Sequence, residues 1–199
     1  VKLLEQGTHF VRWGAEVKNL PLISVGCDNY QGGKEMTEHL IKKGRNNIAF
    51  LGSASTHAPE FFERYKGHCQ SLADHDITVN PALQFNALYT EEAGYQAACQ
   101  LISSGESFDG ICAACDLIAI GAMRALQEHH IDIPEQVALV GFDDIAIASF
   151  TFPALTTVKQ DTQLAGELLV STLLAMISGE EVKTTLIPPE LVIRKSCGS

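Results

Sequence analysis

Short apolar runs alternate with stretches of helical periodicity over the first three quarters of the chain. Apolar residues three or four positions apart indicate helices, and short apolar runs between polar residues indicate strands. Strands are predicted at 22–26, 48–52, 83–89, 108–115 and 137–142, and helices at 32–43, 62–74, 91–102 and 117–130. Helices of this length connect parallel strands, so the pattern predicts an open, doubly wound α/β sheet.

The C-terminal third of the chain breaks this rhythm. A long helix is predicted at 161–178, between a strand at 154–159 and a final strand at 184–194. The inward face of that helix is predicted to carry Leu164, Leu168, Thr172 and Met176. A segment that leaves a sheet, forms one helix and returns as a strand is typical of a chain that crosses between two lobes.

Composition and charge exclude several classes of protein. Of the 199 residues, 46% are hydrophobic and 19% charged, which excludes a disordered chain. The net charge of −10 makes the chain a poor binder of a phosphate backbone. The longest uncharged stretch, 145–158, is too short to span a bilayer, and the first residues show no signal-peptide core. The six cysteines are scattered through apolar segments, which is typical of reduced thiols in a cytoplasmic protein.

The carboxyl ends of the predicted strands carry polar and aromatic side chains. These residues are Cys27, Asp28, Asn29, Tyr89, Cys115, Asp116, Asp143 and Asp144. Ligands of open α/β sheets bind at this edge, and carboxylates beside an aromatic ring suit a neutral, hydroxyl-rich ligand. The alternative for an Asp after a strand is a helix N-cap, and capping is favoured for Asp116, which opens a predicted helix. No helical pattern directly follows Asp143, so its assignment to the ligand is stronger.

Motifs for catalysis and cofactor binding do not occur in the sequence. Neither the GxGxxG nor the GxxxxGK[ST] phosphate loop is present, and there is no GxSxG elbow. The seven histidines show no metal-ligand spacing. Cys112 and Cys115 have the CxxC spacing of a redox pair, but the residues between them favour a buried strand. We therefore predict no catalytic residue, no metal and no cofactor.

Several segments together resemble the effector-binding core of the LacI/GalR family of transcription regulators. The match covers nearly the whole chain, and its Gly-Phe-Asp-Asp and Leu-Thr-Thr-Val runs are specific in combination. The segments are 25–33 (VGCDNYQGG), 37–44 (TEHLIKKG), 48–52 (IAFLG), 115–126 (CDLIAIGAMRAL), 137–145 (VALVGFDDI), 153–161 (PALTTVKQD) and 186–196 (LIPPELVIRKS).

The resemblance implies open, doubly wound parallel sheets in two lobes, as in periplasmic binding proteins, with an incomplete first lobe. The expected N-terminal lobe is 1–44 plus 161–181, and the expected C-terminal lobe is 45–158 plus 184–199. The family's regulators carry a helix-turn-helix headpiece, which this chain is expected to lack. The chain is also expected to begin partway through the first lobe.

A set of effector contacts is implied by the same resemblance. They are Asp28, Arg64, Tyr89, Cys115, Asp143 and Gln160. Taken without the resemblance, Arg64 would be assigned as a surface charge on a helix. Family members often have Asn where this chain has Cys115, and a thiol is a weaker donor and acceptor than an amide. The effector is therefore expected to differ from the usual hexose or to be held mainly by the other groups.

The implied function is an effector-sensing domain of a DNA-binding transcription regulator, a repressor or an activator. A sugar or sugar-like ligand between the lobes would change the interlobe angle and so the operator affinity, with DNA contacted only through the headpiece. A homodimer is expected, with helix 117–130, Phe150 and Phe152 as candidate contacts, and no membrane is expected as a partner. The alternatives are a periplasmic-type sugar-binding protein of a transport system and an oxidoreductase that uses the Cys112–Cys115 pair.

Overall fold

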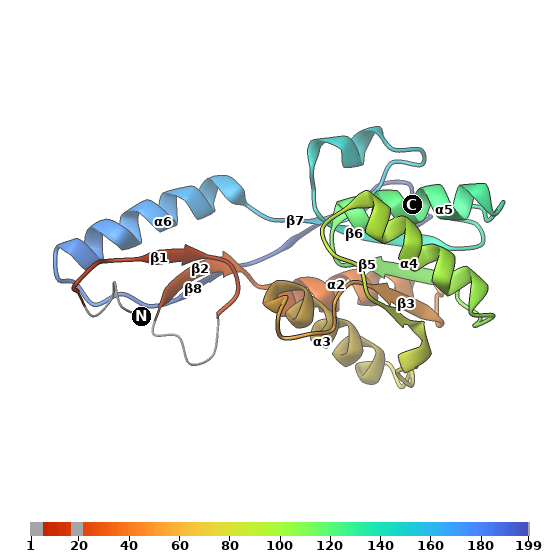
Figure 1. Ribbon diagram of the computed structural model, residues 1–199, viewed down its shortest axis with the longest axis horizontal. Helices are drawn as coiled ribbons and strands as arrows, with labels where there is room; N and C mark the ends of the chain where they lie inside the picture. The colour runs from red at the N-terminus through yellow and green to blue at the C-terminus, as the bar shows by residue number, and fades with distance from the viewer. Residues whose placement is uncertain (1–5, 17–21, 199) are drawn as a thin grey trace.

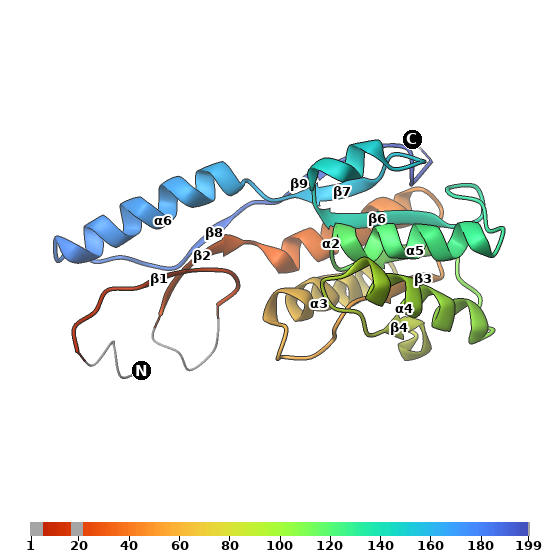
Figure 2. The same ribbon diagram turned by 45° about the horizontal axis from the view of Figure 1, so that its top comes forward.

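The computed structural model describes residues 6–16 and 22–198, which form two sheets (Figure 1). The smaller sheet has three parallel strands in the order β1 (Val11–Trp13), β2 (Ile23–Cys27) and β8 (Thr185–Ile187). Helix α6 (Thr162–Ile177) packs against β1 and β2. We call the segments that carry this sheet and α6 (6–16, 22–27 and 162–187) the small lobe, and the rest of the described chain the large lobe. Figure 2 shows the two lobes at opposite ends of an elongated molecule.

The large lobe is built on a six-stranded sheet with the order β4-β3-β5-β6-β7-β9. The strands are β3 (Ile48–Leu51), β4 (Gln84–Phe85), β5 (Gly110–Ala113), β6 (Ala138–Asp143), β7 (Thr156–Lys159) and β9 (Glu190–Val192). Neighbouring strands are parallel except β7 and β9. Every residue of β3 and β5 is buried, as expected for strands covered on both faces. The predicted doubly wound parallel sheet is confirmed, with one antiparallel strand at its edge.

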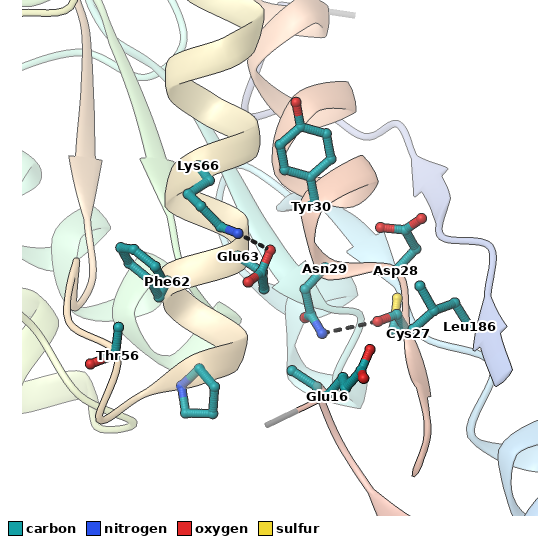
Figure 3. A pocket seen from close by; sticks show the side chains of 12 residues that line it. Glu16, Cys27, Asp28, Asn29, Tyr30, Thr56, Phe62, Glu63, Lys66 and Leu186 are labelled. Carbon is teal, nitrogen blue, oxygen red and sulfur yellow. Dashed lines mark hydrogen bonds and ion pairs between the residues drawn. The ribbon is translucent and has the colours of Figure 1, made fainter. Parts of the chain in front are cut away.

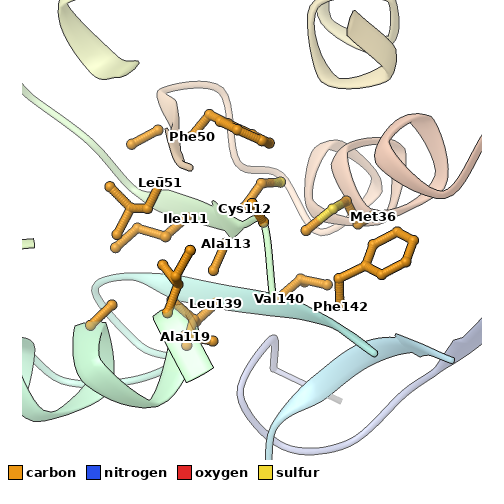
Figure 4. Packing of buried hydrophobic residues seen from close by; sticks show 14 of the residues in the cluster. Met36, Phe50, Leu51, Ile111, Cys112, Ala113, Ala119, Leu139, Val140 and Phe142 are labelled. Atoms are coloured by element: carbon orange, nitrogen blue, oxygen red, sulfur yellow. The ribbon is translucent and has the colours of Figure 1, made fainter. Parts of the chain in front are cut away.

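Helices cover both faces of the large sheet. Helix α2 (Asn29–Lys42) packs against α3 (Pro59–Asp74), and α4 (Glu91–Ser103) packs against α5 (Asp116–Glu128). Figure 4 shows Met36 of α2 and Ala119 of α5 on opposite sides of β5 and β6. Short 3-10 helices lie at Pro81–Leu83 (η1) and Ala146–Phe150 (η2). In the described part of the chain, no helix has the length and hydropathy needed to cross a membrane.

Two glycines set the distance between α2 and α3. A Cβ atom added at Gly33 would overlap the backbone carbonyl of Arg64, and one added at Gly67 would overlap the carbonyl of Tyr30. Because glycine has no side chain, the two helix backbones are in direct contact. This contact places Arg64 beside the N-terminal turn of α2.

Two elements lie in a different lobe from the one expected. Helix α2 was expected in the N-terminal lobe, but it packs on α3 and on strands of the large sheet. Strand β8 was expected in the C-terminal lobe, but it pairs with β2 of the small sheet. The strand predicted at 184–194 is in fact two strands, because Pro188 and Pro189 lack the N–H groups that a ladder needs. The chain therefore crosses between the lobes directly after β2, between β7 and α6, and at the two prolines.

The prediction of which residues of α6 face inward is partly wrong. Leu168, Thr172 and Met176 are half-buried, but Leu164 is 39% exposed, and within α6 only Ala165 is fully buried. The physical reason is the size of the partner. Three strands of three to five residues are too narrow to cover one whole side of a 16-residue helix.

Candidate functional site

A hollow of about 250 Å³ lies at the carboxyl ends of β1, β2 and β6, and both lobes line it. We call it the inner hollow. It brings together four of the predicted effector contacts, Arg64, Tyr89, Asp143 and Gln160. Cys27 and Asn29, which the sequence placed at the same sheet edge without an effector role, also line it. The remaining lining residues, Trp13, Gly14, Glu60 and Phe61, were not predicted, although the position of Trp13 at the end of β1 was an available signal.

Arg64 is the most enclosed charged group of the inner hollow. It is only 3% exposed, so its assignment as a surface charge is wrong. Its Nε donates to Asn29 Oδ1 at 2.8 Å, and Nη1 donates to the carbonyl of Ala114. The guanidinium carbon lies 3.6 Å from the centroid of the Phe142 ring, a cation–π contact. These contacts hold the guanidinium in one orientation, in which Nη1 also lies near the Asp143 carboxylate.

Asp143 is the last residue of β6 and faces Arg64 across the hollow. The carboxylate oxygen Oδ1 lies 3.5 Å from Arg64 Nη1 and accepts a 2.6 Å hydrogen bond from Gln160 Nε2. Burial raises the pKa of Asp143, and the nearby Arg64 charge opposes that rise. Its backbone φ of 111° is strained for a residue with a side chain. The surrounding contacts therefore hold the carboxylate in one orientation.

Arg194 supports the turn that follows β6. Asp144 also has a positive φ, of 53°, and Arg194 Nη2 donates to Asp144 Oδ1 at 2.6 Å. The same guanidinium donates from Nη1 to the carbonyl of Leu155 at 2.8 Å. The adjacent carboxylates of Asp143 and Asp144 thus have different arginine partners. Arg194 lies 50 residues further along the chain, so no local pattern predicts that it pairs with Asp144.

Aromatic rings border the inner hollow. The Tyr89 and Phe61 ring centroids lie 4.5 Å apart, and Tyr89 is about half exposed while Phe61 is buried. The Trp13 side chain, 40% exposed, is also at the hollow. Ring faces of this kind cover apolar C–H groups, while Arg64, Asp143 and Gln160 supply donors and acceptors. The hollow is therefore chemically suited to a small polar ligand with apolar faces.

The other two predicted contacts lie outside the inner hollow. Asp28 caps α2, since its Oδ1 accepts from the backbone N–H of Gln31 at 2.9 Å, and it lines a neighbouring hollow. Cys115 is the N-cap residue of α5 and is almost fully buried. Burial raises the pKa of Cys115 to about 11. The effector roles of Asp28 and Cys115 stay predictions.

Asp116 does not cap α5, so the favoured interpretation of that residue is wrong. The carboxylate is fully buried and points away from its own helix end. Oδ1 accepts a 2.6 Å bond from the Thr157 hydroxyl, and Oδ2 accepts a 2.9 Å bond from the Ile145 N–H. Burial raises the pKa of Asp116 to about 7. The side chain therefore ties α5 to β7 and to the turn after Asp144.

The thiol chemistry of the structure opposes a redox site. No disulfide joins any of the six cysteines, all of which lie in the described part of the chain. Cys112 is fully buried, and burial raises the pKa of its thiol to about 12, so the reactive thiolate is scarce. No group of His, Cys, Asp or Glu side chains suited to hold a metal ion occurs within residues 6–16 and 22–198.

These observations define a two-lobed α/β protein of the binding-protein type, with a ligand-sized hollow between its lobes. The model of the periplasmic binding protein-like domain family matches residues 37–197. The chain therefore belongs to this family.

The relatives of the chain are LacI-family regulators. The HTH-type transcriptional regulator AscG of Escherichia coli K12 is 38% identical over 156 residues, which are 78% of this chain and 46% of that protein. The solved structure of the E. coli repressor AscG has a TM-score of 0.81 at 34% identity, covering 94% of this chain and 68% of that one. This relationship confirms the resemblance to the LacI/GalR core. The chain spans about half the length of the curated relatives it matches.

Two further solved structures are similar. A LacI-family sugar-binding regulator from E. coli, in complex with phosphate, is 32% identical with a TM-score of 0.85, and 98% of this chain and 71% of that chain are covered. The complex of the regulator CelR with cellobiose is 28% identical with a TM-score of 0.90, and the match covers 96% of this chain and 60% of that chain. The relatives are transcription regulators rather than enzymes.

Proposed function

We propose that this chain is the effector-sensing part of a LacI-family transcription regulator and binds a small sugar in the inner hollow. The observation that carries the proposal is the buried Arg64 facing Asp143, with Gln160 hydrogen-bonded to the same carboxylate. A guanidinium donates to ring and hydroxyl oxygens, and a carboxylate accepts from vicinal hydroxyls. The relatives are regulators, which favours this function over a sugar-binding protein of a transport system.

We treat the two lobes as two domains, and ligand binding would change the angle between them. Glu60 of α3 already joins them, because its Oε1 accepts from the Ala15 N–H at 3.0 Å and from Arg12 Nη2 at 3.3 Å. A ligand that touches both lobes favours the closed arrangement by its differential affinity. In the whole regulator this shift would change the operator affinity of a headpiece outside this chain. The chain itself is not proposed to bind DNA, since its net charge is −10.

The whole protein is proposed to be a cytoplasmic homodimer. The η2 region of the large lobe exposes three large apolar side chains, Ile147, Phe150 and Phe152, the last two at 81% and 89%. Exposed apolar clusters of this kind mark protein interfaces. The six cysteines form no disulfide within the described residues, which is consistent with a reducing compartment.

A binding experiment tests the sugar proposal. A thermal-shift screen of the chain against monosaccharides and disaccharides should identify ligands, because binding raises the apparent stability by mass action. Calorimetry should then show that Asp143→Ala abolishes binding of each ligand found. Asp132→Ala, which removes an exposed carboxylate outside the hollow, is the matched control and should bind normally. Unchanged affinity of Asp143→Ala, or no response to any sugar, would reject the proposal.

A further inference from the structure

A second hollow, of about 420 Å³, adjoins the inner one (Figure 3). We call it the outer hollow. Its walls come from both lobes: Tyr30 lies on α2, Phe62 and Lys66 on α3, and Leu186 on β8. Cys27 and Asn29 line both hollows, so the two hollows are neighbours and share these residues. Of the predicted effector contacts only Asp28 lines the outer hollow, and a sugar bound to Arg64, Asp143 and Gln160 would leave this hollow unfilled.

The size of the inner hollow indicates that the ligand extends beyond it. Pockets for small molecules usually measure about 300 to 1,000 Å³. The inner hollow, at about 250 Å³, is smaller than this range, whereas the two hollows together fall within it. The hydrogen bond between Glu60 of the inner hollow and Ala15 of the outer one marks the border between them. A ligand that occupies both would pass this border over Cys27 and Asn29.

The side chains of the outer hollow are of the kinds that bind sugars, namely aromatic rings and charged hydrogen-bonding groups. Tyr30 is 36% exposed, and Phe62 is partly exposed, so both present ring surface. Lys66 Nζ lies 5.4 Å from the Phe62 ring centroid and 2.6 Å from Glu63 Oε2, which sets a donor and an acceptor beside that ring. Figure 3 shows this pair between Phe62 on α3 and Tyr30 on α2. Aromatic faces bordered by charged hydrogen-bonding groups match the apolar C–H faces and hydroxyls of a pyranose ring.

The position of α3 explains how one helix serves both hollows. Glu60, Phe61 and Arg64 face the inner hollow, whereas Phe62 and Lys66 face the outer one. Side chains one or two positions apart on a helix point in different directions, so a single helical turn separates two sets of contacts. A two-ring ligand lying across this turn would contact both sets.

We propose that the outer hollow is a second ring subsite and that the effector is a disaccharide or a comparable two-ring glycoside. One ring binds Arg64 and Asp143 in the inner hollow, and the second ring binds against Phe62 and Tyr30 in the outer hollow. This inference rests on the proposed sugar-sensing function. It adds that Phe62 and Tyr30 contribute to affinity for the second ring only.

Calorimetry with matched ligands tests the subsite. The 199-residue chain is titrated with a panel of disaccharides and with the monosaccharide of each component ring. A disaccharide should bind at least about tenfold more tightly than its monosaccharide, which corresponds to about 1.4 kcal/mol. Phe62→Ala should remove about tenfold from the disaccharide affinity and leave the monosaccharide affinity unchanged. Phe150→Ala, the same change at an exposed ring outside both hollows, is the control.

The outcomes separate the subsite from the proposed function. If a monosaccharide binds as tightly as its disaccharides, or if Phe62→Ala weakens both equally, the second subsite is overturned while the sugar-sensing function stands. If no sugar of either size binds, the proposed function fails and the inference fails with it. Tyr30→Ala, at a more exposed position, provides the same test should Phe62→Ala not fold, and it should show the same selective loss.

Discussion

Replacing Asp116 with Asn should change how the stability of the protein depends on pH. The carboxylate is fully buried, accepts two hydrogen bonds, and has a pKa raised to about 7 from 3.8. Between these values the folded state holds a proton that the unfolded state has released. The free energy of unfolding therefore falls as pH rises from about 4 to about 7, and is lower at neutral pH than at pH 4 on account of this group.

The size of the effect follows from the shift in pKa. One pKa unit corresponds to about 1.36 kcal/mol. The rise of the Asp116 pKa from 3.8 to about 7 therefore lowers the free energy of unfolding by up to about 4 kcal/mol above pH 7. An Asn side chain preserves both contacts, since its amide oxygen accepts from the Ile145 N–H and its NH₂ group donates to the Thr157 hydroxyl. Asp116→Asn should therefore lack this pH dependence and be more stable than the native chain at pH 8.

Urea unfolding followed by far-UV circular dichroism at pH 4.5 to 8 measures this difference. As pH rises, the free energy of unfolding of the native chain should fall relative to that of Asp116→Asn. The difference between the two should reach its full size near pH 8. Asp132→Asn, which changes an exposed carboxylate, should follow the native curve. Parallel curves for the native chain and Asp116→Asn would show that the buried carboxylate does not titrate in this range and would refute the reasoning.

Three further predictions concern packing, the lobe contact and the thiols. Gly33→Ala should lower the free energy of unfolding by about 1–3 kcal/mol or more, because its Cβ overlaps the Arg64 carbonyl, whereas Gly166→Ala, with open space around it, should not; urea unfolding compares them. Glu60→Ala should widen the molecule in small-angle X-ray scattering, because the Arg12 and Ala15 contacts between the lobes are lost, and an unchanged radius of gyration would contradict this. Cys112 should resist iodoacetamide at pH 8 in the folded protein and react after unfolding in urea, because burial raises the pKa of its thiol to about 12. Mass spectrometry of the alkylated peptides measures the labelling, and rapid labelling of Cys112 in the folded chain would count against this prediction.

Much of the site was predictable because strand ends are a local property of the sequence. An apolar run such as 137–142 predicts a buried strand, and the residue after it falls at the ligand-binding edge of a parallel sheet. Asp143 and Tyr89 were found by this reasoning and do line the inner hollow. Asp116 satisfied the same rule but is fully buried between β7 and the turn after Asp144. A strand-end rule places a residue at an edge without specifying which way its side chain points.

Other features of the site depend on contacts between distant segments. Nothing local distinguishes Arg64 from a surface charge, and its burial follows from the close approach of α2 and α3 at Gly33 and Gly67. The ion pair of Arg194 with Asp144 joins residues 50 positions apart. Such pairings require the lobes and helices to be assembled first, so a pattern along the chain does not reveal them.

The sequence by itself determined the parallel α/β architecture, because the periodicity of apolar residues and the right-handed crossover rule act over short segments. The tertiary structure alone decided which lobe each element joins and which side chains meet in the hollows. Helix α2 contacts α3 and strands of the large sheet, and strand β8 pairs with β2 of the small sheet, although the sequence predicted the opposite lobe for each. Burial at a contact is a property of two surfaces, and the sequence of one segment describes only one of them.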